Sequence, residues 1–309
     1  MTRRVRLKSL AKINLDLRVL HRNPDGFHEL RTVFHTISLA DSIDIEYEPS
    51  RRTQIELDDP AGIPDNLIVC AAKAALDAMR HTARVRFRLV KNIPMGAGLG
   101  GGSSNAAAVL IALPALAGRA LPQAPKIAAS LGSDVPFFLM GGAALGLGRG
   151  TELYPLPDLK PEPLLLACSG VHVATGKAYQ DLRRGPNFAD YAPRIERFQT
   201  YVSALQRERS AASAGALSAN DFEPVVFRHY PRLRAIRTKL GIGGATARMT
   251  GSGSAVFALF ASAEERELAA AELRKDRMFR ECRLIPTTLV SRGRYQALWR
   301  RALEPSAPI

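Results

Sequence analysis

The sequence has few cysteines and no long hydrophobic run, and each absence excludes a class of protein. Only three cysteines occur among 309 residues, and their spacing matches neither a zinc site nor a redox motif, so we expect a reducing compartment. The longest apolar run, residues 106–117, is too short to span a membrane and contains Pro114. The basic N-terminal stretch lacks the apolar segment of a signal peptide. We therefore expect a cytoplasmic protein with no membrane partner.

Acidic residues are scarce relative to basic ones. The chain has 43 Lys and Arg against 29 Asp and Glu, a net charge of +14, and 34 of the basic residues are arginines. Such a field can bind nucleic acid or steer small polyanions toward a cleft. The arginines are spread along the chain, and aromatic residues are not interleaved with them as a base-stacking platform requires. We therefore expect that most of the arginines lie on solvated faces and that the protein has no nucleic-acid partner; the sequence does not indicate an oligomeric state.

Length and local patterns predict two domains that both mix helices and strands. At roughly 150 residues per domain the chain allows two, and the proline-rich segment 154–163 separates a first domain, 1–155, from a second, 156–309. Strict alternation over residues 9–20 predicts a half-buried strand with its polar residues on the open face. Further strands are expected over 32–39, 42–47, 85–89, 164–168, 247–250 and 256–261, and helices over 66–79, 105–113, 125–131 and 263–275.

A glycine-rich loop joins the expected strand at 85–89 to the helix at 105–113. Five glycines within residues 96–102 allow the backbone to approach an anion closely, and the N-terminus of the following helix adds a positive dipole. The dinucleotide fingerprint G-x-G-x-x-G is present, but residues 91–133 contain no Asp or Glu to hold a ribose. Walker A and protein-kinase signatures are absent. The loop therefore predicts a phosphate site of another kind.

Five segments together resemble the GHMP kinases, and within them the members that act on a cytidine-linked acceptor. They are residues 11–15, 25–28, 94–104, 133–138 and 249–254. The resemblance implies an α+β fold with a ribosomal-S5-like N-terminal domain, a ferredoxin-like C-terminal domain and a cleft between them for ATP and acceptor. It also implies transfer of the ATP γ-phosphoryl group to the 2-hydroxyl of a cytidine diphosphate-linked methylerythritol, a step of the non-mevalonate isoprenoid pathway.

The resemblance also implies roles for individual residues. Lys12 and Asp134 are the expected catalytic pair, because a carboxylate can take the hydroxyl proton and an ammonium can stabilise charge. Asn14 shares the strand face of Lys12 and is expected to bind the same acceptor. The expected ATP-binding residues are Pro94, Met95, Gly96, Ala97, Gly98, Leu99, Gly100, Gly101, Gly102, Ser103 and Ser104.

Aromatic residues are expected at the cytidine. Phe27 and His28 align with a tyrosine and a histidine of the family, and Phe27 retains stacking while it lacks the hydroxyl. Tyr179 is a second expected stacking ring, in a stretch that also contains His172 and Thr175. The glycine-rich residues 251–254 are expected to lie beside the first loop and to shape the nucleotide site.

Mg²⁺ is expected with ATP, because a divalent ion neutralises the charge that develops during phosphoryl transfer. The sequence shows no dedicated cluster of metal ligands; the hydroxyls of Ser103 and Ser104 are candidate contacts. Two alternatives remain open: a GHMP kinase for another small acceptor, such as homoserine or mevalonate, and a nucleic-acid-binding protein. The residues at 25–28 favour the cytidine-linked acceptor over the first, and the five segments together, with no interleaving of aromatic and basic residues, speak against the second.

Overall fold

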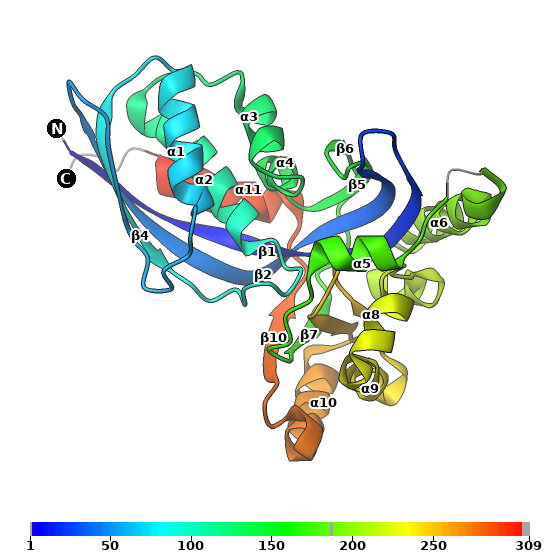
Figure 1. Cartoon of the computed structure of the whole chain (residues 1–309). Coiled ribbons are helices and arrows are strands. Elements are labelled where there is room, and N and C mark those ends of the chain that lie inside the picture. The colour runs from blue at the N-terminus through cyan, green and yellow to red at the C-terminus, as the bar shows by residue number, and fades with distance from the viewer. Residues whose placement is uncertain (1, 186–187, 305–309) are drawn as a thin grey trace.

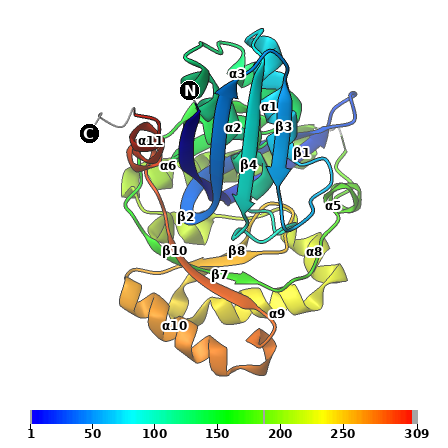
Figure 2. The same ribbon diagram turned by 90° about the vertical axis from the view of Figure 1, so that its left-hand side faces the viewer.

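The computed structural model describes residues 2–185 and 188–304, and in this part of the chain two β-sheets lie against each other (Figures 1 and 2). The larger sheet has the order β3-β4-β2-β5-β6, with β1 paired to β2. Its strands are β1 (Arg3–Arg22), β2 (His28–Pro49), β3 (Gln54–Asp58), β4 (Ala83–Val90), β5 (Ala143–Gly148) and β6 (Glu152–Pro155). Only β3 and β4 pair in parallel among these strands of the described chain.

Four helices cover one face of this sheet (Figure 1). They are α1 (Leu67–Ala78), α2 (Gly101–Ala117), α3 (Ala124–Leu131) and α4 (Val135–Met140). In β4, Val85, Phe87 and Leu89 are buried beneath the helices and alternate with exposed arginines, as the alternating pattern predicts. Helix α2 begins earlier than predicted, at Gly101. The end of the glycine loop is therefore the first turn of a helix.

The smaller sheet has the order β10-β7-β9-β8, formed by β7 (Pro163–Cys168), β8 (Thr246–Met249), β9 (Val256–Leu259) and β10 (Arg283–Thr288). Strand β7 is apolar on both faces because both are covered. Leu164 and Leu166 pack against Ile13 and Val33 of the β1–β2 hairpin. The opposite face packs on α8 (Glu223–His229), α9 (Pro231–Leu240) and α10 (Ala263–Lys275) (Figure 2). The long hairpin is thus shared by both halves of the molecule.

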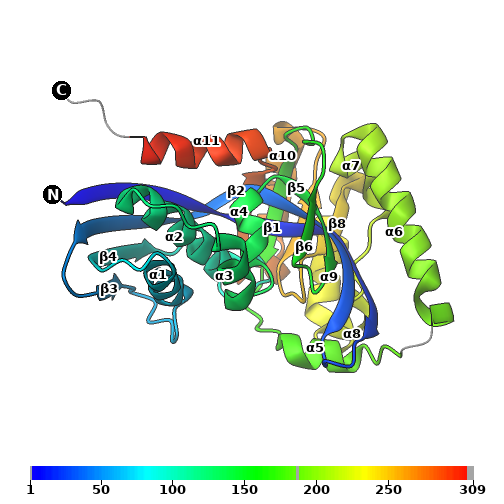
Figure 3. The same ribbon diagram turned by 90° about the horizontal axis from the view of Figure 1, so that it is seen from above.

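The remaining elements are α5 (Thr175–Asp181), α6 (Phe188–Glu208), α7 (Ala211–Ala214), α11 (Arg292–Leu303) and short 3₁₀ turns at Gly215–Leu217, Ile242–Gly244 and Arg277–Phe279. Helix α11 returns to the first sheet (Figure 3). There Trp299 Nε1 donates to the carbonyl of Lys8 at 3.1 Å, and Tyr295 Oη donates to the carbonyl of Phe138 at 2.6 Å. The domain boundary near residue 155 stays a prediction. Helix α11, although it comes last in the chain, packs in the core of the first domain.

Two strand predictions are wrong in detail. The predicted strands 32–39 and 42–47 are parts of one strand, β2, which continues through Asp41. Strand β1 is not half-buried: Lys12, Asn14, Asp16 and Arg18, on its polar face, are all buried. The second half of the chain covers that face, since Leu17 N donates to the carbonyl of Ala219 and Leu17 O accepts from Asp221 N.

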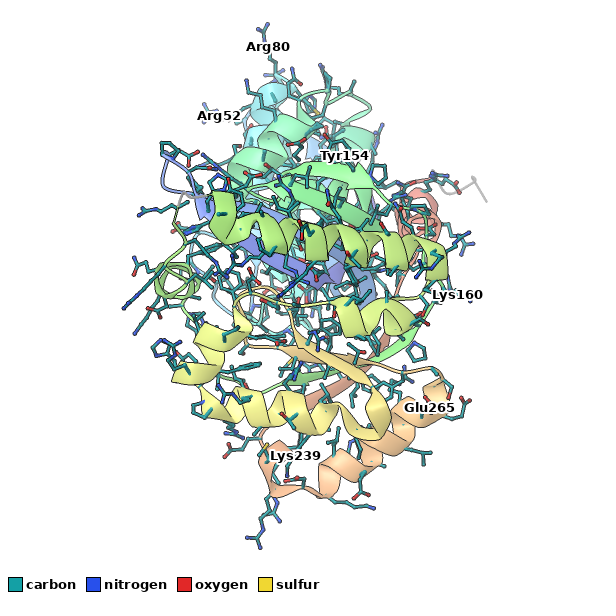
Figure 4. The ribbon with its side chains drawn as sticks, turned by 90° about the vertical axis from the view of Figure 1, so that its right-hand side faces the viewer. Arg52, Arg80, Tyr154, Lys160, Lys239 and Glu265 are labelled. Carbon is teal, nitrogen blue, oxygen red and sulfur yellow. The ribbon has the colours of Figure 1, made fainter. Side chains whose placement is uncertain are left out.

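The cysteines and several charged side chains lie far apart in the sequence. Cys70, Cys168 and Cys282 are free thiols. Within residues 2–185 and 188–304, every helix is too short or too polar to cross a membrane. Figure 4 labels charged side chains from separate segments of the chain. These are Arg52, Arg80, Lys160, Lys239 and Glu265.

Candidate active site

The two glycine-rich loops meet at the centre of the molecule. Gly98 has a φ of +76°, and a Cβ there would lie 2.4 Å from the carbonyl oxygen of Thr250. The loops are also joined by a hydrogen bond from Ala255 N to Ala97 O, at 3.2 Å. Only glycine combines this backbone conformation with so close an approach. The first loop is therefore held between β1, through Lys12 N to Leu99 O at 3.0 Å, and the second loop.

Lys12 and Asp134 form an ion pair beside these loops. Lys12 Nζ lies 3.2 Å from Asp134 Oδ2, and the side chain of Lys12 is 4% exposed whereas that of Asp134 is 32% exposed. Asp134 precedes helix α4 as its N-cap residue, but its side chain makes no capping hydrogen bond. A carboxylate at this position usually caps the helix. Here it is left to contact Lys12 and a ligand.

Asn14 connects the lysine to the second glycine loop. Its Oδ1 accepts from Lys12 Nζ at 2.8 Å and from Gly251 N at 3.1 Å, and its Nδ2 donates to Thr32 Oγ1 at 2.8 Å. Its backbone N also donates to Thr250 Oγ1, at 3.0 Å. Asn14 thus orients the ammonium group and ties β1 to the other domain. A direct bond from Asn14 to a substrate stays a prediction.

A cleft of about 720 Å³ opens over this pair. Its walls come from β1, both glycine loops, the start of α4, helix α5 and the β1–β2 turn. Five cationic side chains line it: Lys12, Arg22, Arg149, Arg183 and Arg184. Among the described residues that line it, Asp134 is the only carboxylate. Such a field favours an anionic ligand.

The expected cytidine residues lie together at one end of the cleft. The rings of His28 and Tyr179 stack with centroids 4.8 Å apart, and Phe222 meets Tyr179 edge-on at the same separation. Arg149 lies over the ring of Phe27, 3.6 Å from its centroid, and Phe27 is half exposed. Burial, with the charges of nearby arginines, lowers the pKa of His28. Its ring is therefore neutral near pH 7 and can both donate and accept a hydrogen bond.

Thr175 and His172, at and just before the start of helix α5, contact different glycine loops. Thr175 lines the cleft, and its Oγ1 lies 2.8 Å from Ser252 Oγ of the second loop. His172 lies instead against the first glycine loop, where a Cβ on Gly96 would come within 2.7 Å of its Nδ1. Burial first, and then the charge of Asp134, raise the pKa of Tyr179, so its hydroxyl stays protonated.

The predicted ATP residues contribute in different ways. Gly98, Gly100 and Ser103 line the cleft. The side chains of Ala97 and Leu99 point into the core, so they can offer only backbone groups to a nucleotide. Met95 is 62% exposed. Direct contacts of the eleven residues with ATP stay predictions.

Several residues of the site carried no signal in the sequence. The Nδ2 of Asn220 donates to Met249 O at 2.7 Å and to Gly251 O at 2.8 Å, and Glu223 accepts from Met249 N. These bonds fix the second glycine loop from outside. Neither residue belongs to a local pattern with that loop. Only the folded chain brings them together.

The described residues contain no cluster of three or more His, Cys, Asp or Glu side chains that could hold a metal ion. Ser103 lies at the cleft, whereas Ser104 is fully buried and its hydroxyl has no hydrogen-bond partner among the described residues. Mg²⁺ usually keeps several waters and is bound by one or two side chains together with substrate phosphates. Ser103 and Asp134 fit that kind of site.

Comparisons with known proteins agree with this architecture. The GHMP kinases N terminal domain model matches residues 66–142, and the GHMP kinases C terminal model matches residues 201–277. The solved structure of a homoserine kinase from Cytophaga hutchinsonii superposes with a TM-score of 0.70, over 93% of this chain and 95% of that one. The solved structure of a mevalonate kinase superposes with a TM-score of 0.69, over 94% of this chain and 99% of that one. At 16% and 14% identity these two show the fold alone. The predicted two-domain α+β fold is confirmed.

More similar proteins narrow the class. A 4-diphosphocytidyl-2-C-methyl-D-erythritol kinase from Solibacter usitatus is 52% identical over 98% of this chain and 94% of its own length. One from Gloeobacter violaceus is 40% identical over 82% and 85%. A crystal structure of a 4-(cytidine 5'-diphospho)-2C-methyl-D-erythritol kinase matches with 36% identity and a TM-score of 0.74, over 94% of this chain and 99% of that one. The chain belongs to the GHMP kinases and, within them, to the 4-diphosphocytidyl-2-C-methyl-D-erythritol kinase family.

Proposed function

We propose that the chain transfers the γ-phosphoryl group of ATP to the 2-hydroxyl of 4-diphosphocytidyl-2-C-methyl-D-erythritol, giving the 2-phosphate and ADP in the non-mevalonate isoprenoid pathway. The observation that carries the proposal is the Lys12–Asp134 contact at 3.2 Å, which faces a cationic cleft between two glycine loops. The His28–Tyr179 stack at one end of the same cleft suits a nucleobase. Family membership supplies the choice of acceptor.

The catalytic pair acts on the acceptor hydroxyl. As the hydroxyl oxygen forms its bond to the γ-phosphorus, the bond from that phosphorus to the bridging oxygen of ADP breaks. The hydroxyl proton passes to the Asp134 carboxylate, which is 32% exposed and free of helix capping. Lys12, held by Asn14 at 2.8 Å, stabilises negative charge on the acceptor oxygen and on the transferred group.

The glycine loops are assigned to the nucleotide phosphates. Their backbone N–H groups and the N-terminus of α2 provide donors without side chains in the way. Ser103 or Asp134 would hold Mg²⁺ bound with ATP, and the ion would supply neutralisation of phosphate charge there. We also keep as predictions a cytoplasmic location and the absence of a nucleic-acid partner.

ADP release from Mg-ATP tests the assignment. We expect release to depend on 4-diphosphocytidyl-2-C-methyl-D-erythritol and not on free methylerythritol, mevalonate or homoserine. Asp134→Asn keeps the shape of the side chain but removes its charge, so we expect kcat to fall by about 10²- to 10⁴-fold while the KM for ATP changes little. Equal release with mevalonate or homoserine would show that the acceptor is misassigned. An unchanged kcat in Asp134→Asn would exclude the carboxylate as the proton acceptor.

A further inference from the structure

The cleft contains one cation whose place is fixed by the protein but whose hydrogen bonds are incomplete. Arg184 follows helix α5 and lines the cleft, and its side chain is only 17% exposed. Its Nη2 donates to Asp221 Oδ2 at 3.0 Å. Its Nε is buried and has no hydrogen-bond partner among the described residues. A buried donor without a partner is uncommon in a folded protein, and the residue that carries it lines both this cleft and a second pocket that Asp221 also lines.

Asp221 holds Arg184 in place. The same Oδ2 accepts from Val19 N at 3.1 Å and lies 3.3 Å from Arg194 Nε. The backbone of Asp221 donates to Leu17 O at 2.9 Å, so the carboxylate is anchored to strand β1, which also carries Lys12. Arg184 and Arg194 both contact this carboxylate, which holds Arg184 at the cleft.

The other cations of the cleft have different surroundings. Lys12 is paired with Asp134, and Arg149 is paired with Asp25 at 2.6 Å. Arg22 is exposed and donates to the carbonyl of Gly26, and Arg183 is exposed. Arg184 alone among these five combines burial, a fixed ion pair and an unsatisfied donor. Its charge also contributes to lowering the pKa of His28, so it lies near the end of the cleft assigned to the nucleobase.

We propose that Arg184, oriented by Asp221, binds the diphosphate that links the nucleoside to the polyol of the acceptor. A guanidinium group presents parallel N–H donors that match two oxygens of a phosphate. Arg184 lines the cleft with 17% of its side chain exposed, and its Nη2 is held by Asp221. This inference rests on the proposed function, and it makes Arg184 a residue that selects for a nucleoside diphosphate-linked acceptor, with Asp221 as its positioning residue.

Inhibition by cytidine and by cytidine diphosphate tests the inference. Both should compete with the acceptor, and only the second carries the diphosphate. For Arg184→Ala we expect the inhibition constant of cytidine diphosphate and the KM of the acceptor to rise by about tenfold to a hundredfold. The inhibition constant of cytidine and the KM for ATP should stay within about twofold of their wild-type values. Equal losses for cytidine and its diphosphate, or no loss for either, would overturn the inference.

Two arginines provide matched controls. Arg183 is adjacent and exposed in the same cleft, and Arg194 shares Asp221 but is absent from the cleft lining. Arg183→Ala and Arg194→Ala are each expected to change the preference for the diphosphate by less than about threefold. If either control variant lost as much of the preference for cytidine diphosphate over cytidine as Arg184→Ala, the result would show a general charge effect instead of a specific contact.

Arg184→Lys covers the case in which the alanine variant does not fold. It keeps the charge beside Asp221 but lacks the planar fork, so the inhibition constant of cytidine diphosphate should rise by severalfold. No change would contradict the assigned contact. Calorimetric titration with cytidine diphosphate, in the presence of a non-hydrolysable ATP analogue, separates this inference from the proposed function. Wild-type protein that binds the diphosphate through Arg184 without phosphorylating the acceptor would refute the function and retain the contact.

Discussion

Replacing Gly98 by alanine should separate the two glycine loops. The Cβ would lie 2.4 Å from Thr250 O and 3.2 Å from Gly253 O, and both are backbone atoms that cannot rotate away. The backbone at Gly98 also has a φ of +76°, which costs about 1–2 kcal/mol for a residue with a Cβ. Forcing packed groups apart costs typically about 1–3 kcal/mol more. We therefore expect Gly98→Ala to lower the free energy of unfolding by about 2–5 kcal/mol.

Gly118 provides the matched control for this variant. Its φ is +63°, but a Cβ there meets nothing within 4 Å. Gly118→Ala should thus show the backbone cost alone, about 1–2 kcal/mol, and the difference between the two variants measures the contact between the loops. Urea unfolding gives both free energies, and ADP release gives the KM for ATP. We expect that KM to rise about tenfold or more in Gly98→Ala and to stay unchanged in Gly118→Ala.

Two results would refute this reasoning. Equal stability of the two alanine variants would show that the loops do not touch at Gly98. A normal KM for ATP in a destabilised Gly98→Ala variant would show that the contact supports the fold but does not shape the nucleotide site.

The remaining predictions concern pH and the second glycine loop. Burial lowers the pKa of His35 to about 4, below its unfolded value of about 6.5, so the stability it contributes is present above pH 6.5 and is lost as the pH falls toward 4. Between pH 7 and pH 5 the free energy of unfolding should fall by about 2 kcal/mol through this group. Urea unfolding of His35→Gln should show a smaller decrease over the same pH range. An equal decrease in the variant would assign the acid sensitivity to other groups. Asn220→Asp removes the two donors to Met249 O and Gly251 O and places a charge against carbonyl oxygens, so unfolding should become easier by about 2–4 kcal/mol and the KM for ATP should rise. A variant as stable as wild type would show that the second loop does not depend on Asn220.

Patterns within short segments of the sequence correctly predicted helices and strands that depend only on those segments. The alternation of β4 and the helix at 263–275 are confirmed, because one buried face and one capped helix are properties of a short segment. The pairing of Lys12 with Asp134 came only from the family resemblance. These residues are distant in sequence, and neither alone differs from an ordinary strand lysine or helix cap.

The polar face of β1 shows what a local pattern lacks. Alternation indicates which residues share a face, but not whether that face meets water or another domain. Asp16 and Arg18 are paired in a bidentate contact with both distances at 2.8 Å and are buried, and Asp16 also accepts from Ala219 N at 2.7 Å. That partner lies two hundred residues away. The sequence shows only that Asp16 and Arg18 are opposite charges two residues apart on one strand face. The structure shows that a distant segment of the chain buries this pair.

The excess of arginine serves two different environments that composition cannot separate. On the open face of the first sheet, Arg4 pairs with Glu46 and Arg86 with Glu56, each at 3.0 Å and largely exposed, and such pairs contribute little to stability. In the cleft, cations face a space with a single described carboxylate. Two phosphate-bearing substrates must approach each other there, and a second carboxylate would add to their repulsion. A proton acceptor is nevertheless required, and the single carboxylate of the cleft, Asp134, is the one that contacts Lys12, at 3.2 Å.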